Sequence, residues 1–514
     1  MSITLPPARS VTANPTQEQL RELTSKMPNA VLTEFDNYDV MTEVTARSAG
    51  STFVVSDDGA WSCKPTMPRA ENDEIVSRQD AYIADREMLL VEGYIGPENS
   101  PLKRPARVYI EASNSNIPAM QQQLYYPKDS DWREEDALTV IYTPNLDAPG
   151  YPDGRVVTID LDNWVTRVVG IDYFGESKMG GLRMWMEWAF QQDALAMHAG
   201  AKVIPTDRGD KVGLIIGLSG TGKTTTTFTR QNGSLPVQDD IVALTEGGEV
   251  YSTENGCFAK TYGLDARYEP IIHAALTSPS AWLENVAVDD RGKIDFFDDS
   301  YTANGRGTFA LADIEHFDPR KLGKADFLLI LNSNETIAPA VAKMSSVEQA
   351  VAYFMLGETK GTSAGGVAEA GKSLRVPGTN PFFMRHEFLQ GNRLGDLIRS
   401  MNYNFGVYVL NTGRVGGSKD VAGSKKVKIP HSSAVVKAIA EGTIEWEADP
   451  DFGYLVASHV PDFDDPELLQ PRRLFASQGR EDEYDRTVEK LKEERKAYLA
   501  EHEGLTPGVA ESVG

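Results

Sequence analysis

The sequence predicts an α/β fold divided into two or more subdomains. The chain has 514 residues, of which 41% are hydrophobic, so it can bury a large core and is longer than one compact unit needs. Short β-rich runs separated by turn clusters fill residues 31–170. An apolar strand, a glycine-rich loop and a helix then follow one another over residues 212–230. This order is typical of the unit with which α/β proteins hold phosphate groups.

The N-terminal part of the chain is predicted to be rich in strands. TQEQLRELTSKM predicts a capped helix that begins near Thr16. The predicted strands are STFVV, ARVYIEA, LTVIYTP and GRVVTIDL, with turn clusters such as DAPGYPDG between them. Over residues 175–200, apolar residues at helical spacing are interrupted by Gly and Asp, which predicts one long helix or two short ones.

The C-terminal part continues the α/β pattern. ADFLLILNS and FGVYVLNTG predict strands, and SVEQAVAYFML between them predicts a helix. A glycine-rich stretch near residues 358–375 is a candidate mobile lid. The charged stretch REDEYDRTVEKLKEERKAYLAEH predicts a helix that packs on the surface or on a partner subunit, which makes it a candidate contact for a homo-oligomer, with a flexible tail behind it.

Composition excludes some classes of partner. The 75 acidic and 51 basic residues give a net charge of −24, which argues against nucleic acid as the main partner. No stretch reaches the roughly 18 apolar residues of a membrane span, and the N-terminus does not resemble a signal peptide. Two cysteines are too few for a disulfide framework, so we expect a reducing compartment, the cytoplasm.

The loop GLSGTGKTT carries the clearest functional signal. Its glycines permit a tight turn whose backbone N–H groups point inward, Lys223 supplies a charge for the terminal phosphates, and Thr224 has a hydroxyl that can bind Mg²⁺. The predicted phosphate-binding residues are Gly217, Leu218, Ser219, Gly220, Thr221, Gly222, Lys223, Thr224 and Thr225. The alternative, a glycine-rich surface turn, is disfavoured by the position of the loop between a strand and a helix.

Two adjacent carboxylates are candidate metal ligands. Asp239 and Asp240 lie at a turn beside an apolar run, LPVQDDIVAL. A bound nucleotide needs an acidic partner for its metal ion, and two carboxylates suit two ions. The alternative is a solvated acidic turn.

Four segments together resemble a known family. GLSGTGKTT, the following DD, STENGCFAKTYGL and VLNTGRVGG are similar, in order and spacing, to the ATP-dependent phosphoenolpyruvate carboxykinases, whose matching segments read like FEGGCYAK and NTGWxGG. The resemblance is strongest from about 140 to 435. It implies decarboxylation of oxaloacetate and phosphorylation of the resulting enolate by ATP, at the entry to gluconeogenesis. It also implies two divalent ions, Mg²⁺ on the nucleotide and Mn²⁺ between the γ-phosphate and the enolate oxygen.

The resemblance also implies a domain organisation. It predicts a two-domain carboxykinase-like fold with an α/β substrate domain over residues 1–195 and a P-loop nucleotide-binding domain over 196–478. Residues 479–514 form the charged C-terminal helix and tail. The cleft between the two domains would hold oxaloacetate and ATP.

Individual residues match the family's site. TARSAG places Arg47 at oxaloacetate or CO₂, DYFGESKMGG places Tyr173 beside the carboxyl group, and YTANGRGTF places Arg306 at both the substrate and the γ-phosphate. His198 and Asp240 match two Mn²⁺ ligands. On the nucleotide side the implied residues are Lys260, Lys426 and Ser432, besides the loop.

Two departures weaken the oxaloacetate half of the resemblance. The family has two adjacent lysines, of which the second binds Mn²⁺ as a neutral amine, where this chain has Lys178 and Met179. A thioether is a poor ligand for Mn²⁺, so either Lys178 takes the role by a one-residue shift or the second metal site is altered. Ile241 and Val242 also replace two polar residues beside the aspartates.

Three functions therefore remain open at this point. The first is the carboxykinase reaction, which Arg47, Tyr173, His198, Asp240 and Arg306 favour. The second is a diverged kinase that uses ATP on another acceptor, and the third is a catalytically silent ATP-binding subunit. Met179, Ile241 and Val242 favour the second and third.

Overall fold

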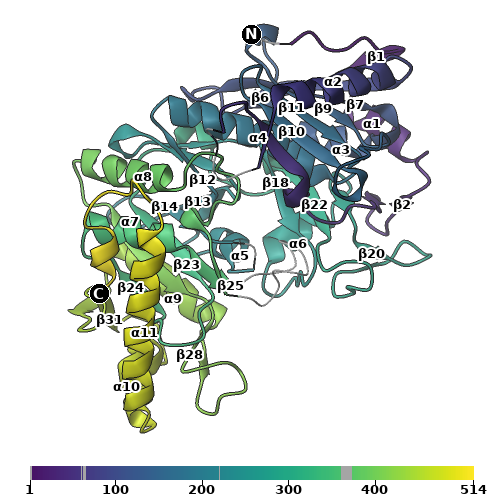
Figure 1. Cartoon of the computed structure of the whole chain (residues 1–514). Coiled ribbons are helices and arrows are strands. Elements are labelled where there is room, and N and C mark those ends of the chain that lie inside the picture. The colour runs from purple at the N-terminus through teal and green to yellow at the C-terminus, as the bar shows by residue number, and fades with distance from the viewer. Residues whose placement is uncertain (1–2, 60, 62–64, 219, 361–372) are drawn as a thin grey trace.

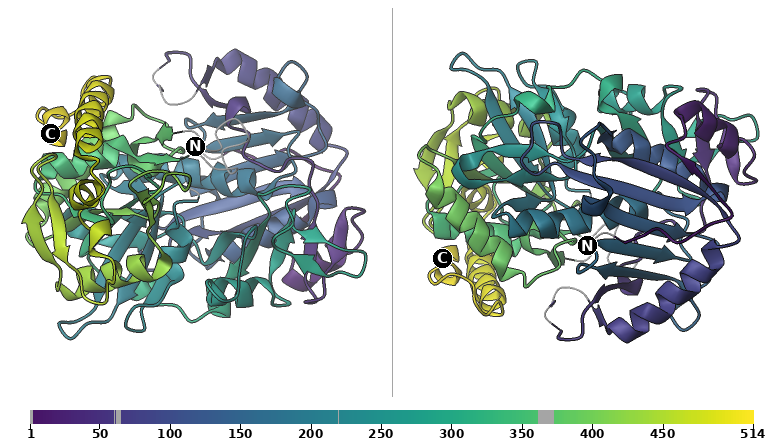
Figure 2. Two further views of the ribbon diagram at one scale, coloured as in Figure 1. Left: turned by 90° about the horizontal axis from the view of Figure 1, so that it is seen from below. Right: turned by 90° about the horizontal axis from the view of Figure 1, so that it is seen from above.

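The computed structural model describes residues 3–59, 61, 65–218, 220–360 and 373–514. Two large sheets dominate these residues, one in the N-terminal half and one in the C-terminal half (Figure 1). The two halves lie side by side in views from below and from above (Figure 2). The protein therefore has the mixed α/β architecture that the sequence predicts.

The first sheet is nine-stranded among the described residues. Its order is β1 (Ser10–Ala13), β6 (Glu87–Ile95), β7 (Arg104–Glu111), β9 (Leu138–Thr143), β11 (Val165–Val169), β10 (Val156–Asp160), β4 (Thr52–Val55) and β5 (Thr66–Met67), and β8 (Tyr126–Pro127) pairs with β6. The four predicted strands of this half are confirmed as β4, β7, β9 and β10. Its helices are α1 (Gln17–Thr24), α2 (Arg69–Ile83), α3 (Asn116–Leu124) and α4 (Phe174–Gln191).

Local sequence accounts for the start of α1 and for the close packing of α4 on the sheet. Thr16 caps α1, since its hydroxyl accepts from the Gln19 backbone and the Gln19 side chain accepts from the Thr16 backbone, as the sequence predicts. Helix α4 is one helix of 18 residues, although Gly180 and Gly181 lie inside it. A Cβ on Gly180 would lie 3.0 Å from Val140 of β9, so the glycine allows α4 to approach the sheet closely.

The second sheet carries the glycine-rich loop. Its order is β15 (Leu235–Gln238), β13 (Ala199–Ile204), β14 (Lys211–Ile216), β23 (Phe327–Asn332), β27 (Gly406–Asn411), β24 (Val341–Lys343), β31 (Leu455–His459) and β30 (Glu445–Ala448). Strands β14, β23 and β27 are parallel and buried. The predicted strands at ADFLLILNS and FGVYVLNTG are thus confirmed, and SVEQAVAYFML forms α7 (Val347–Leu356).

Smaller sheets join the two halves. One contains β18 (Gly256–Lys260), β22 (Arg306–Ala310), β19 (Trp282–Glu284), β3 (Tyr38–Val40) and β2 (Ala30–Leu32), so a segment of the second half pairs with the start of the chain. Another contains β12 (Leu195–Met197), β16 (Val242–Leu244) and β17 (Val250–Ser252). Three strand pairs complete the set, β20 (Ala287–Val288) with β21 (Ile294–Asp295), β25 (Glu358–Lys360) with β26 (Ser373–Arg375), and β28 (Arg414–Val415) with β29 (Lys425–Lys426). The expected lid falls mainly on residues 361–372, which lie outside the described residues.

The remaining helices lie in the C-terminal half, where most pack around the second sheet and α6 (Pro270–Leu276) packs on β22 of the smaller sheet. They are α5 (Lys223–Phe228), α6, α7, α8 (Phe388–Ser400), α9 (Ile429–Glu441), α10 (Pro471–Ser477) and α11 (Glu481–Ala500). The charged helix α11 buries Tyr484, Val488 and Leu499 in the same core cluster as α7, and its buried Arg495 donates to the Tyr353 hydroxyl of α7 at 3.1 Å. The tail behind it is held too, because Val509 and Val513 are fully buried in that cluster. The expectation of a flexible tail is therefore wrong. The two valines are spaced so that both side chains reach the core cluster, and this holds the tail in place.

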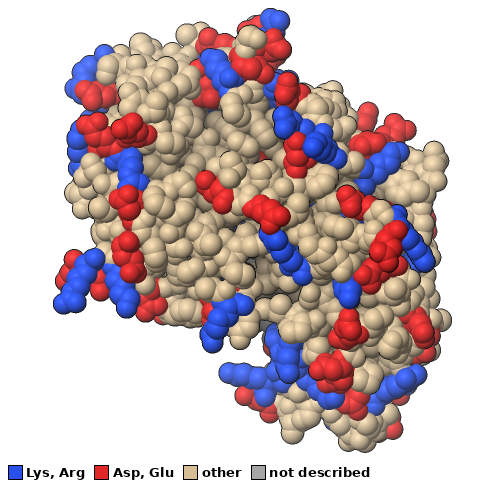
Figure 3. Space-filling view, turned by 180° about the vertical axis from the view of Figure 1, so that it is seen from behind, with Lys and Arg blue, Asp and Glu red and all other residues tan. Residues whose placement is uncertain are grey.

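Charge on the surface is mixed rather than gathered. On the face seen in Figure 3, acidic and basic side chains are interspersed and separated by uncharged residues. Within the described part of the chain, no helix is both long and apolar enough to cross a bilayer.

Candidate active site

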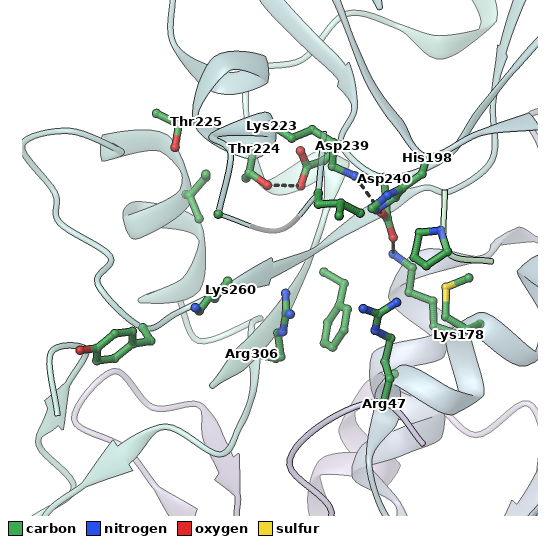
Figure 4. Close-up of a pocket in the computed structure, with 18 of the residues that line it drawn as sticks. Arg47, Lys178, His198, Lys223, Thr224, Thr225, Asp239, Asp240, Lys260 and Arg306 are labelled. Carbon is green, nitrogen blue, oxygen red and sulfur yellow. Dashed lines mark hydrogen bonds and ion pairs between the residues drawn. The ribbon is translucent and has the colours of Figure 1, made fainter. Parts of the chain in front are cut away.

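The predicted site residues meet around two neighbouring cavities. The first, of about 300 Å³, lies between α4 and the glycine-rich loop (Figure 4). The predicted residues that line it are Arg47, Tyr173, Lys178, His198, Leu218, Gly220, Gly222, Lys223, Thr224, Thr225, Asp239, Asp240, Lys260 and Arg306. The second, of about 350 Å³, is lined by Gly220, Thr221, Gly222, Thr225, Lys426 and Ser432 among others. Gly217 lines neither cavity, and Ser219 lies outside the described residues.

The glycine-rich loop turns between β14 and α5. Gly220 and Gly222 have φ values of 87° and 91°, in the left-handed region where a residue with a Cβ is strained. The backbone and the hydroxyl of Thr221 both donate to Leu218 O, and the Thr412 hydroxyl donates to Thr221 O. The sequence thus fixes the loop by glycine where the backbone must be left-handed and by threonine where it needs a partner.

Asp240 is the centre of a buried cluster of charges. Its carboxylate lies 2.5 Å from Lys178 Nζ, 2.9 Å from His198 Nε2 and 3.0 Å from Lys223 Nζ. These residues come from α4, from the end of β12 and from the start of α5, so one carboxylate joins three elements (Figure 4). Burial alone raises the pKa of Asp240, but Lys178 and Lys223 outweigh burial and hold the pKa well below its usual range.

Lys178 is bound to two carboxylates. Its side chain is 2% exposed, and its Nζ also lies 3.1 Å from Glu254 Oε2. Burial disfavours the ammonium, but the attraction of Asp240 and Glu254 is larger and raises the pKa of Lys178. Lys178 is therefore held as a cation between these two carboxylates.

The ring of His198 is oriented by the backbone. Nδ1 lies 2.9 Å from Thr379 O, and a carbonyl can only accept, so Nδ1 donates. This leaves Nε2 facing Asp240. Burial, and next the charge of Lys223, lower the pKa of His198.

Asp239 and Thr224 form a second polar pair. The Thr224 hydroxyl donates to Asp239 Oδ2 at 3.0 Å, whereas Asp239 Oδ1 is buried without a hydrogen-bond partner. Burial raises the pKa of Asp239. An unpartnered buried oxygen is costly, so this pair is suited to a cation from outside the protein.

Three basic side chains rise from the other side of the cavity (Figure 4). Lys260 and Arg306 are paired residues of the adjacent strands β18 and β22, which explains how residues 46 positions apart come together. Burial, and next the charge of Arg306, lower the pKa of Lys260 to about 8. Arg47 lies over the ring of Phe382, with 5.0 Å between the guanidinium carbon and the ring centroid. In Figure 4 the guanidinium groups of Arg306 and Arg47 point into the cavity, toward the side on which Lys223 and Asp240 lie.

Arg306 is aimed by its neighbours. Its Nη2 donates to Asn304 Oδ1 at 2.9 Å, and its guanidinium carbon lies 5.4 Å from the centroid of Phe258. Its Nε is buried without a partner. Tyr173 is 2% exposed, and its hydroxyl accepts from Asn304 at 3.5 Å, so it forms part of the wall.

Several residues of the site and its support were not among the sequence predictions, and of these Phe258 and Phe382 line the first cavity. Glu254 and Phe258 lie within the segment STENGCFAK, where only Lys260 was singled out. Asn304 lies two residues before Arg306. The sequence does not show that its side chain accepts a hydrogen bond from Arg306. Phe382 has no signal in the sequence, because its contact with Arg47 joins residues 335 positions apart.

Comparison with known proteins gives one family. Residues 9–466 match the family model described as phosphoenolpyruvate carboxykinase. The chain is 32% identical over 445 residues to a phosphoenolpyruvate carboxykinase (ATP) of Aeropyrum pernix, with 83% of each chain covered. A relative with the same name from Thermus thermophilus is 28% identical over 494 residues, covering 92% of this chain and 90% of its own. One from Alkaliphilus oremlandii is 29% identical over 436 residues, covering 82% and 79%.

The buried charge cluster predicts a large effect of Lys178→Met. The substitution removes the cation between Asp240 and Glu254 and leaves two buried carboxylates facing each other, so the free energy of unfolding should fall by about 3–5 kcal/mol. Denaturant unfolding at neutral pH measures it. Lys26→Met, which breaks the exposed pair with Glu22, is the control and should leave stability unchanged within error. Equal free energies of unfolding for the two variants would contradict a stabilising role of Lys178 in the charge cluster.

Proposed function

The chain belongs to the phosphoenolpyruvate carboxykinase (ATP) family, and on that premise we propose which of its residues carry out the reaction. The enzyme decarboxylates oxaloacetate and transfers the γ-phosphoryl group of ATP to the enolate, giving phosphoenolpyruvate, CO₂ and ADP. One observation carries the assignment of residues. Five cationic side chains, Arg47, Lys178, Lys223, Lys260 and Arg306, line one cavity of a protein with a net charge of −24.

The electrostatics suit a reaction among anions. A dicarboxylate, an enolate and a triphosphate would repel one another in a cavity with few charges, and burial without partners would be costly. Among the described lining residues, the carboxylates are Asp239, Asp240 and Glu269. Asp240 is already neutralised by Lys178 and Lys223, and Glu269 accepts from the Thr225 hydroxyl at 2.7 Å. The remaining cations face the space where substrates would lie.

We assign the nucleotide to the two cavities together. The backbone of the glycine-rich loop and Lys223 would hold the β- and γ-phosphates as a P-loop does. The second cavity, with Lys426 and Ser432, would hold the nucleoside. The loop residues Gly220, Gly222 and Thr225 line both cavities, which supports one ligand that spans them.

The first metal ion fits the residues present. Thr224 and Asp239 offer a hydroxyl and a buried carboxylate oxygen without a partner, and oxygen donors are those that Mg²⁺ prefers. We propose that these two residues hold the ion of the nucleotide. When bound, Mg²⁺ withdraws charge from the phosphate oxygens and so favours transfer of the phosphoryl group.

The second metal ion, Mn²⁺, does not fit as well. His198 and Asp240 are together, but the third expected donor is the thioether of Met179, which also lines the cavity. Lys178 cannot replace it as a neutral amine while Asp240 and Glu254 hold its ammonium. Among the described residues, no group of three or more His, Cys, Asp and Glu side chains could hold a metal ion.

The protein's own residues account for the substrate half. We propose that Arg47 binds a carboxylate of oxaloacetate and that Tyr173 forms the wall beside it. Loss of CO₂ leaves an enolate, whose oxygen attacks the γ-phosphorus while the bond to ADP breaks. Arg306 and Lys260 lie where they can stabilise the charge shared by the enolate and the γ-phosphate.

A coupled assay tests the function. Purified protein with ATP, oxaloacetate and Mg²⁺, with and without Mn²⁺, should form phosphoenolpyruvate and ADP in equal amounts. No phosphoenolpyruvate despite measurable ATP binding would instead support a kinase with another acceptor or a silent ATP-binding subunit.

Arg306→Ala separates catalysis from nucleotide binding. Because Arg306 would act on charge that develops during transfer, we expect phosphoenolpyruvate formation to fall about 10²- to 10³-fold. The dissociation constant of ATP, measured by calorimetry, should change less than about threefold. Arg267→Ala is the control, because Arg267 is exposed and pairs with Asp265. Equal losses of ATP binding and activity would contradict the role of Arg306.

Met179→Lys tests the altered metal site. A lysine here could add an amine donor beside His198 and Asp240, so the affinity of the free protein for Mn²⁺, measured by electron paramagnetic resonance, should rise about tenfold or more. Met179→Leu is the matched control and should bind Mn²⁺ as the unaltered protein does. No rise in the lysine variant would mean that Met179 is not what weakens the site.

A further inference from the structure

A buried lysine behind the nucleotide cavity has no part in the mechanism above. Lys202 of β13 is 0% exposed. Its ammonium donates to Thr226 O at 3.0 Å, to Thr229 O and to Gln231 Oε1 at 2.6 Å. All three acceptors are uncharged, so this cation is held by hydrogen bonds alone.

The acceptors lie at the end of the helix that starts with the phosphate-binding lysine. Helix α5 has six residues, Lys223–Phe228, and Thr226 and Thr229 supply carbonyls of its last turn. A cation at a helix C-terminus interacts favourably with the helix dipole and with carbonyls that have no partner inside the helix. Because α5 is so short, a shift at its end would also move Lys223 and Thr224 at its start.

The contacts continue across the second cavity. Gln231, whose carbonyl accepts from Lys202, donates through Nε2 to Ser433 Oγ at 3.1 Å. Ser433 belongs to α9, and Thr226, Thr229, Gln231 and Ser433 all line the second cavity. Lys202 thus joins the end of α5 to the facing helix through a single side chain.

We propose that Lys202 is a positioning residue for the nucleotide: through α5 and through Gln231 it fixes the two walls between which the nucleoside binds. This inference rests on the proposed use of the second cavity for the nucleoside. Lys202 is not among the described residues that line either cavity, so its effect on the nucleotide would pass through the residues that it holds.

A contribution to folding stability does not explain the buried charge of Lys202. Burial lowers the pKa of Lys202 to about 7, whereas a lysine in an unfolded chain has a pKa of about 10.4. Between these values the unfolded chain binds more protons than the folded chain, so the contribution of Lys202 to stability rises with pH in that window and is least favourable below about pH 7. A neutral side chain of similar shape would avoid this cost but would leave Thr226 O, Thr229 O and Gln231 Oε1 without this donor.

Steady-state kinetics of Lys202→Met and Gln231→Leu test the proposal. We expect the KM for ATP to rise about tenfold in the first variant and about threefold or more in the second. The KM for oxaloacetate should stay within about twofold in both. Lys211→Met is the matched control, since Lys211 is at the far end of the neighbouring strand β14, pairs with Asp326 and should leave both constants unchanged. Thermal unfolding of both variants is measured alongside, because loss of buried hydrogen bonds alone would lower the unfolding temperature without a preference for one substrate.

Two outcomes would overturn the proposal. One is a KM for ATP within about twofold of the unaltered value in both variants, and the other is an equal rise of both KM values together with a lower unfolding temperature. If Lys202→Met does not fold, the KM for ATP of Gln231→Leu alone tests the proposal. If the unaltered protein makes no phosphoenolpyruvate, the proposed function fails, and calorimetric binding of ADP to the same variants still tests the role of Lys202.

Discussion

The carboxylate of Asp240 is the constraint on which the rest of the site depends. It is the only group that Lys178, His198 and Lys223 have in common among the described contacts, and these three residues belong to different parts of the fold. Without the carboxylate, three positively charged or polar groups would meet in a buried space and repel one another. Asp240 therefore sets the distance between α4, which packs on the first sheet, and the glycine-rich loop of the second.

The partners of the cationic side chains also show how an acidic protein can form a cavity lined by cations. Cations near the substrate space are aimed by uncharged partners, as Asn304 and Phe258 aim Arg306 and Phe382 supports Arg47. Their charge is therefore left for the ligands. Cations that hold the framework are instead neutralised, as Arg183 is by Glu176 at 2.9 Å within α4 and Arg495 is by Glu358 at 2.7 Å on α11. Two lysines depart from this pattern, because Lys223 pairs with Asp240 although it faces the proposed phosphate site, and Lys202 supports the framework through uncharged acceptors alone.

The sequence predicts those features that local chemistry decides. Apolar runs and turn residues indicate the strands β4, β7, β9, β10, β23 and β27, and Thr16 indicates the start of α1, because each depends on neighbours in the chain. Long-range pairing is not predictable in this way. The pairing of Lys260 with Arg306 needs the register of β18 and β22, and the contact of Phe382 with Arg47 needs the whole fold. Lys202 is hidden for the same reason, since its partners lie on a different element.

Helical geometry underlies the proposal that Lys178 does not replace the metal-binding amine that position 179 lacks. Successive residues of an α-helix point about 100° apart, because a turn holds 3.6 residues. From position 178 the side chain reaches Asp240 and Glu254, and both carboxylates bind its ammonium. An amine can donate a lone pair to a metal ion only after losing a proton, and two adjacent carboxylates oppose that loss. Lys178 and Met179 both line the cavity, so under the proposed function the cavity offers a bound ammonium and a thioether where a metal-binding amine would be needed.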